Sequence, residues 1–200
     1  MSKNQLSKFL MLLFVSFIYI SGSIQAQSLR INSKTSTMTI YGTTNVHDFI
    51  TRVEQIKGEL VVNSSKKIQS LNVEIPVHSI KSGEKGMDNK TYEAFKDTKF
   101  PTITFQLVDV TSLQISGEEI NVTVNGNLTM AGASRRISFR STGKKLKSGE
   151  YEFKGSIPLK MTDFNMKPPT AMLGVMKVGN AITLKYDINL EGAAINLASK

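Results

Sequence analysis

The chain contains no cysteine. Disulfide bonds, thiolate catalysis and thiolate metal sites are therefore excluded together, and so is the cysteine-linked lipid anchor of bacterial lipoproteins. An exported domain needs no disulfides when it has a sufficient core, because an oxidising compartment permits them without requiring them. The fold must depend on side-chain packing and strand pairing.

Histidine is almost as scarce, with only His47 and His78 in the whole chain. A catalytic triad needs a nucleophile, a base and an orienting group in one place. His47 beside Asp48 offers a base with a carboxylate neighbour, but no nucleophile motif accompanies them, and adjacent residues of a strand point to opposite sides. Zinc sites need three or four ligands held together, whereas the two histidines lie on different expected segments. We expect no enzyme activity, no catalytic residue, no metal and no cofactor.

Methionine is the one further class of metal ligand to consider, since it can bind Cu(I). Four methionines fall between residues 161 and 176. They are spaced among leucine, phenylalanine and valine, which favours their interpretation as packing material.

No apolar run is long enough to span a bilayer, which takes roughly 20 residues. The longest, at residues 9–20, follows Lys3 and Lys8 and precedes the small, polar sequence SGSIQA. This layout predicts a secretory signal peptide at residues 1–26, with an uncleaved anchor as the alternative. The remaining residues, 27–200, suit one domain with its own core. The expected location is the periplasm or the exterior of the cell.

Acidic residues are outnumbered, 16 to 25, and the net charge is +9. Nucleic acid is not expected as a partner, because no aromatic side chains interleave with the basic clusters as a stacking platform would require. Two interpretations of the basic residues stay open: a solvated face, and contact with an anionic membrane surface. The densest basic cluster comprises Arg135, Arg136, Arg140, Lys144, Lys145 and Lys147.

The most informative feature that is present is alternation of apolar and polar residues over long stretches. It is clearest at residues 120–130, 151–161 and 182–190. Such alternation indicates half-buried antiparallel strands with one dry face. Because many strands occur with hardly any helix, their dry faces must enclose a common interior, in a barrel or a sandwich. We expect eight main strands at residues 36–43, 52–62, 67–77, 101–111, 119–131, 134–142, 151–162 and 180–191, with a short extra one at 29–31.

Two connections break the alternation. The first holds an expected helix near residues 87–96, capped by Asp88, with Met87, Tyr92 and Phe95 on one apolar side. The second, residues 164–179, contains a Pro-Pro pair, several methionines, Leu173 and Val175. We expect it to fold over an opening or an edge of the barrel.

Five motifs stand out along the chain: GTTNVHDF at 42–49, YEAF at 92–95, KFPTITF at 99–105, GNLTMAG at 126–132 and PPTAMLG at 168–174. In sequence and in order they resemble the YceI-like family, and most closely its branch in Bacteroidetes-type bacteria. The resemblance implies a periplasmic or secreted, lipocalin-like, eight-stranded antiparallel β-barrel whose cavity holds an isoprenoid or similar lipid.

Two of the family's polar motifs are altered here. The arginine-aspartate-x-histidine before the helix reads MDNK at 87–90, and the later arginine-x-aspartate-phenylalanine reads MTDF at 161–164. These groups would meet a ligand headgroup, so the resemblance carries the barrel over but leaves the identity of the ligand open.

The leading hypothesis is an exported carrier for a lipid-like, polyprenyl molecule. An eight-stranded barrel is just wide enough to be filled by side chains or to hold one small ligand. Gly126 and Gly155 are expected to leave room on the apolar faces, and His47 and Asp48 to form a polar mouth. The alternative is a filled barrel that binds another envelope component, and exposed apolar edges leave a homodimer open. The expected ligand-binding residues are Phe105, Leu128, Met130, Phe139, Ile157, Leu159, Met161, Phe164, Met172 and Met176.

Overall fold

The computed structural model describes residues 27–192 except 64 and 66. Residues 1–26, on which the expected signal peptide falls, and residues 193–200 lie outside the described part. The side chains of Ala171 and Met172 are also outside it.

Within this range the chain is almost entirely strand, with one α-helix and three short 3-10 turns. The elements are β1 (Gln27–Ile31), β2 (Thr37–Thr44), β3 (Asp48–Val53), β4 (Lys57–Val62), β5 (Ile68–Pro76), η1 (Val77–Ser79), β6 (Ile80–Lys81), α2 (Lys85–Phe95), β7 (Thr102–Ser116), β8 (Glu119–Met130), β9 (Ala133–Lys145), β10 (Tyr151–Lys160), η2 (Met161–Phe164), β11 (Thr170–Ala171), η3 (Met172–Gly174) and β12 (Met176–Gly192).

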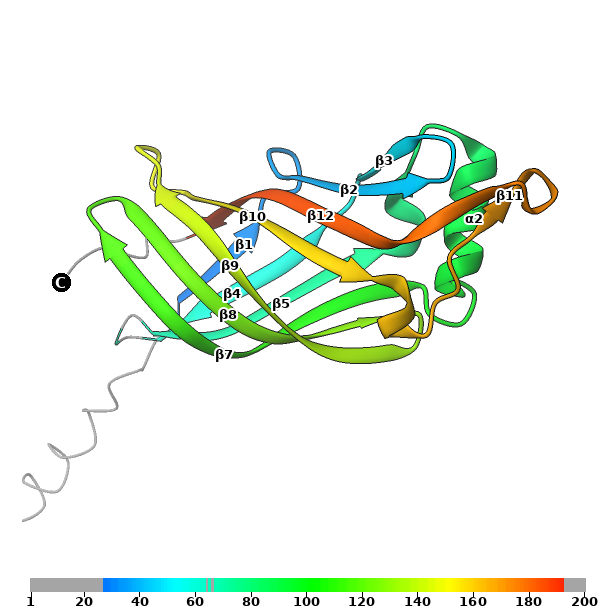
Figure 1. The fold of residues 1–200 in the computed structure, drawn as a ribbon. Helices are drawn as coiled ribbons and strands as arrows, with labels where there is room; N and C mark the ends of the chain where they lie inside the picture. Colours follow the sequence, from blue (N-terminus) through cyan, green and yellow to red (C-terminus); the bar gives the residue numbers. More distant parts are fainter. Residues whose placement is uncertain (1–26, 64, 66, 193–200) are drawn as a thin grey trace, which may run out of the picture.

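Eight antiparallel strands close a barrel, which confirms the expected fold class. The order around the ring is β1-β4-β5-β7-β8-β9-β10-β12, and β1 pairs with β12 to close it. The β2–β3 hairpin is an additional branch on the free edge of β12 and continues to β6. Figure 1 shows this hairpin and α2 at one end of the elongated barrel, with the β7–β8 turn at the other.

The alternation of apolar residues is the physical cause of the barrel. Along β8 every even-numbered residue from Ile120 to Met130 is buried, whereas every odd-numbered residue between them is partly exposed. Because successive strand side chains point to opposite faces, one face of each strand supplies the interior and the other meets water.

The expected strand at 52–62 is wrong, because two strands occupy it. β3 ends at Val53 and β4 begins at Lys57, and between them the Glu54 N–H donates to the Ser79 carbonyl at 2.8 Å. The alternation changes phase at this junction, because the more buried positions are odd-numbered in β3 and even-numbered in β4, from Ile56 onward. The two consecutive exposed residues between them, Glu54 and Gln55, are the local sign of the break. The hairpin that precedes it is held by the Thr44 hydroxyl, which accepts from the N–H groups of Val46 and His47.

The helix is confirmed, but its expected cap is wrong. The helix begins earlier than expected, at Lys85, and its N-cap residue Glu84 makes no side-chain cap hydrogen bond. Asp88 instead lies inside the first turn, where its Oδ1 accepts from the N–H and the hydroxyl of Ser82, each at 2.7 Å. It therefore ties α2 to the strand before it.

Candidate functional site: two successive cavities in the barrel

An apolar inner cavity of about 160 Å³ lies in the middle of the barrel. Among the described residues, the polar ones that line it are Ser141 and Tyr186. Aliphatic and aromatic walls of this kind favour a small apolar group over water. The lining comprises Ile31, Met38, Ile56, Leu60, Ile68, Leu71, Val73, Ile75, Ile103, Phe105, Leu107, Val122, Val124, Leu128, Ile137, Phe139, Ser141, Phe153, Ile157, Leu184, Tyr186, Ile188 and Leu190.

A larger outer cavity of about 570 Å³ lies under α2, the β2–β3 hairpin and the segment that follows β10. Its volume is within the range usual for small-molecule sites. Apolar side chains such as Phe95, Met130 and Met166 form its floor, and polar ones such as Thr44, Ser82 and Lys160 also line it. Its composition suits a molecule that is part apolar and part polar.

The two cavities follow one another along the barrel interior. Leu184 of β12 lines the inner cavity, and Ile182, the next residue on the same face, lines the outer one. On β8, Leu128 lines the inner cavity, and Met130, the next residue on the same face, lines the outer one. Ile40, which is paired directly with Leu184, also lines the outer cavity. Residues that line the two cavities are therefore immediate neighbours at the junction.

The expected ligand-binding residues divide between these cavities and the solid core. Phe105, Leu128, Phe139 and Ile157 line the inner cavity. Met130, Met161 and Met176 line the outer one, together with both residues of the expected polar mouth, His47 and Asp48.

Leu159 and Phe164 line neither cavity. Phe164 is 1% exposed, and Leu159 is half-buried against the core. Met172 lies in η3, and its side chain falls outside the described part. In the same segment Met166 lines the outer cavity, as folding over an opening predicts, but Leu173 and Val175 are exposed instead of covering it.

The expectation that Gly126 and Gly155 leave empty space is wrong. A Cβ atom at Gly126 would lie 2.2 Å from Cζ of Phe105, and one at Gly155 would lie 2.2 Å from the hydroxyl of Tyr186. Each glycine is therefore covered by an aromatic ring from a neighbouring strand, and the ring uses the space. Burial raises the pKa of the Tyr186 hydroxyl, and the neighbouring Ser141 offsets part of the shift.

The sequence did not indicate how α2 contributes to the outer cavity. Met87, Thr91 and Ala94 line it from the helix, and Thr51 and Val178 line it from β3 and β12. Residues 87, 91 and 94 recur at helical spacing, so the pattern was available. What it lacked was the position of the helix over the barrel end.

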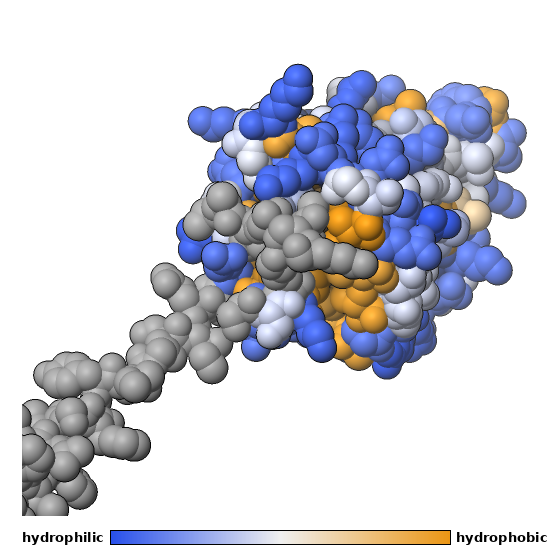
Figure 2. All heavy atoms as spheres, turned by 90° about the vertical axis from the view of Figure 1, so that its left-hand side faces the viewer, coloured by the Kyte–Doolittle hydropathy of each residue, from blue (hydrophilic) through white to orange (hydrophobic). Residues whose placement is uncertain are grey.

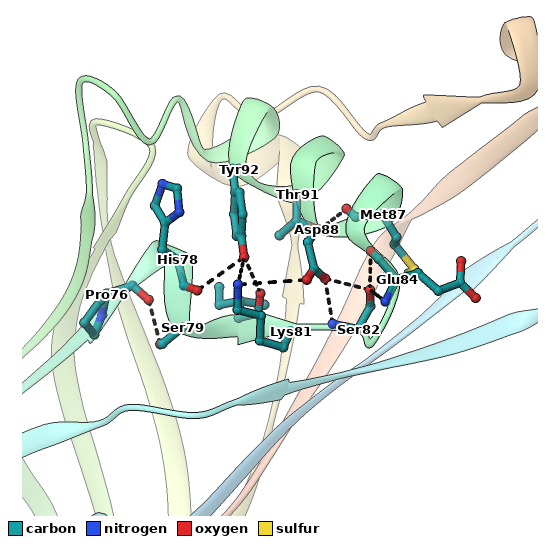
Figure 3. Close-up of polar contacts among 11 residues, drawn as sticks. Pro76, His78, Ser79, Lys81, Ser82, Glu84, Met87, Asp88, Thr91 and Tyr92 are labelled. Carbon is teal, nitrogen blue, oxygen red and sulfur yellow. Dashed lines mark hydrogen bonds and ion pairs between the residues drawn. The ribbon is translucent and has the colours of Figure 1, made fainter.

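A polar network fixes the helix in that position (Figure 3). The Lys81 ammonium donates to the Tyr92 hydroxyl at 2.6 Å, and that hydroxyl contacts the His78 and Ile80 carbonyls at 3.2 and 3.3 Å. The hydrogen bond with Tyr92 raises the pKa of Lys81. Burial acts to raise the pKa of Asp88, but the two Ser82 hydrogen bonds and the Lys81 charge outweigh it and lower that pKa. The carboxylate form therefore holds α2 over the outer cavity.

The two histidines have different surroundings. His47 Nδ1 lies 3.1 Å from the main-chain oxygen of Asp48. His78 Nε2 lies 2.6 Å from the Asp97 carboxylate, and its ring stacks on Tyr92. Among the described residues no group of three or more histidines or carboxylates could hold a metal ion.

Much of the basic cluster is engaged by neighbouring groups. Arg136 pairs with Asp109, and the Arg135 Nε donates to the Asp163 carbonyl at 2.7 Å. Lys144 pairs with Glu152 at 3.1 Å, and this hydrogen bond contributes most to lowering the pKa of Glu152. The pattern is that of a solvated strand face with internal charge pairing.

Comparison with known proteins settles the family. The model of the YceI-like domain matches residues 25–190. The chain belongs to the YceI-like family. No curated protein matches this YceI-like chain by sequence. In the part of the chain that the structure describes, no helix has the length and apolar character needed to cross a membrane.

Solved structures share the fold of this YceI-like chain at low sequence identity. A polyisoprenoid binding domain from Saccharophagus degradans has a TM-score of 0.66 and 14% identity, with 84% of this chain and all of that chain covered. BcnA from Burkholderia cenocepacia has a TM-score of 0.64 and 19% identity, over 80% and 98% of the two chains. The YceI protein of Campylobacter jejuni has a TM-score of 0.56 and 21% identity, over 72% and 85%.

Proposed function

We propose that this protein is an exported carrier that holds a polyprenyl lipid, with the hydrocarbon chain in the inner cavity and the headgroup in the outer one. The observation that carries the proposal is the succession of an apolar cavity and a larger cavity with polar lining, whose walls meet at Leu184 and Ile182. The YceI-like family and the polyisoprenoid binding domain with the same fold support it. The proposed contact residues are the expected ligand-binding and polar-mouth residues that line the two cavities: Phe105, Leu128, Phe139, Ile157, Met130, Met161, Met176, His47 and Asp48.

The mechanism is non-covalent. Each buried methylene contributes about 0.8 kcal/mol by leaving water, and ordering a flexible chain offsets part of this gain. The methionines of the outer cavity suit a ligand without a rigid shape, because their side chains are flexible and polarizable. His47, Asp48 and Lys160 would contact the headgroup. The alternative of a filled barrel is disfavoured, because about 160 and 570 Å³ of the interior are not occupied by side chains.

Mass spectrometry tests the proposal directly. The protein, purified from the periplasm or culture medium of its native host, is extracted with organic solvent and the extract is analysed for polyprenyl lipids. We expect one dominant lipid in stoichiometric amount. Protein that is repeatedly recovered empty and takes up neither farnesol nor undecaprenol in vitro would refute the carrier. The same purification tests export, because N-terminal sequencing should find Gln27 as the first residue.

The rim of the outer cavity offers a surface for loading from a membrane. Leu173 is fully exposed, and so in large part are Val175 and Val46. Leu173 has a φ of 56°, which is unfavourable for a leucine. The Asn45 amide donates to the Val175 carbonyl at 2.9 Å and joins the two hairpins that carry these side chains. We propose that this apolar tip, Val46, Leu173 and Val175, enters an anionic membrane surface.

The basic residues next to the tip suit an anionic bilayer, because Lys167 and Lys177 are both exposed. The chain has no tryptophan, so L173W introduces a single fluorescent reporter. We expect its emission to shift to the blue with phosphatidylglycerol vesicles and far less with phosphatidylcholine. The control is S148W, in the exposed turn between β9 and β10. An equal shift at both positions, or none at L173W, would contradict membrane contact by the tip.

A further inference from the structure

The wall of the barrel forks between β5 and β7 at the end opposite α2. These strands pair only from Pro76 with Thr102 to Asn72 with Gln106. Beyond this point β7 continues to Ser116, whereas β5 extends back to Ile68, and no pairing joins the two extensions among the described residues. Each strand keeps its other neighbour, since β5 pairs with β4 and β7 with β8. The opening is therefore in the side of the barrel.

The fork has a local cause in β7. Its register with β8 shifts twice, between Leu107 and Asp109 and between Val110 and Ser112. Irregularities of this kind bend a strand and increase its twist. Both lie just past Gln106, the last residue of β7 that is paired with β5. The extension of β7 follows β8 away from β5.

The side chains at the fork belong to the inner face of the barrel. Leu113 is paired with Val122 and Ile115 with Ile120, and both partners are buried. Directly paired residues project to the same face. Leu113 and Ile115 nevertheless remain 39% and 38% exposed. The inner face of β7 therefore exposes apolar side chains to solvent at this end. An apolar group bound against Leu113 and Ile115 would cover them.

The inner cavity extends to this opening. Leu71 and Leu107 are the first residues of β5 and β7 beyond their last pair, and both line the cavity. Ile68, at the start of β5, lines it as well. Figure 2 looks onto this end of the molecule, where apolar surface gathers in the middle and hydrophilic residues surround it. The apolar lining thus continues from the cavity onto the exposed inner face of β7.

We infer that the fork is a side exit for the hydrocarbon chain of a ligand too long for the lumen. The inference rests on the proposed function and adds a ligand class to it: polyprenyl chains longer than the barrel. The ten residues of β10 cover roughly 25 Å of barrel axis at about 3.4 Å per residue and a tilt near 40°. The end of a longer chain leaves between β5 and β7 and lies against Leu113 and Ile115.

The double variant L113D/I115D tests the exit, because two carboxylates at the fork disfavour an apolar chain there. Both positions are already partly exposed, so folding should survive, and a cooperative unfolding transition verifies it. S112D/Q114D is the matched control, since its exposed positions alternate with the test positions on the same strand. The probes are farnesol, which the lumen can hold, and undecaprenol, which exceeds it.

We expect L113D/I115D to weaken undecaprenol binding at least tenfold and to leave farnesol binding within twofold of the unchanged protein. S112D/Q114D should bind both probes normally. Equal binding of undecaprenol by both variants and the unchanged protein would overturn the exit while leaving the carrier intact. Failure of the unchanged protein to bind either probe would overturn the carrier itself. A dimer that L113D/I115D dissociates would assign the fork to a second copy of the chain, and would also overturn the exit.

Discussion

Replacing Ile182 by tryptophan will reduce the affinity for polyprenyl lipids by about 100-fold, or about 2.7 kcal/mol. Ile182 lines the outer cavity and is followed on the same face of β12 by Leu184 of the inner one. An indole at this junction separates the two cavities, so the headgroup and the chain can no longer occupy both. The larger side chain can also strain the wall, at a cost of about 1–3 kcal/mol in the free energy of unfolding.

A displacement assay with a fluorescent prenyl analogue measures the change. The control is K185W, which places the same indole on the outer face of the same strand, where Lys185 is exposed. We expect K185W to bind the analogue normally. If I182W and K185W retain equal affinity while both unfold cooperatively, the ligand does not pass through the junction and the proposed path is wrong.

Substituting Gly155 by alanine will lower stability and ligand affinity together. The new Cβ would lie 2.2 Å from the Tyr186 hydroxyl and 2.4 Å from the ring carbon that bears it. The ring must move, and because Tyr186 lines the inner cavity, it can move into the space that the ligand chain would use. We expect the free energy of unfolding to fall by about 1–3 kcal/mol and the affinity to fall about tenfold.

A double-mutant cycle isolates this contact. In the Y186L background the ring is absent, so adding G155A should cost little stability. The coupling energy between the two substitutions is measured by denaturant unfolding and should exceed about 0.5 kcal/mol, as expected for residues in contact. Additive changes in the free energy of unfolding would show that the alanine methyl group does not displace the Tyr186 ring. The position of the ring would then not require a glycine at 155.

The barrel could be predicted from the sequence because its cause is local. The alternation in β8 and β10 predicts which side chains face inward. A chain made almost entirely of strands has few ways to bury the apolar face of each strand. The β3–β4 break has a local sign, the adjacent exposed residues Glu54 and Gln55, at which the buried positions change phase. Its partner, the Ser79 carbonyl that accepts from the Glu54 N–H, is distant in the chain. Local pattern contains no information about such a partner.

The cavities could be predicted only in part, for a similar reason. Periodicity identified inward residues such as Phe105 and Ile157, but it could not separate those that border empty space from those in solid packing, such as Phe164. The glycines show the limit most clearly. Gly126 and Gly155 look like gaps along the chain, whereas rings from neighbouring strands, Phe105 and Tyr186, lie over them.

The pairing of Leu29 with Gly192 joins a residue near the start of the described part to its last residue. The ring closes only when β12 pairs with β1, so a growing chain must wait for β12 before the interior is sealed from water. Topologies dominated by such distant pairings fold slowly, on a millisecond-to-second scale. In the proposed exported carrier, late closure would give the chain time to cross a membrane unfolded and to bind a lipid before β1 pairs with β12.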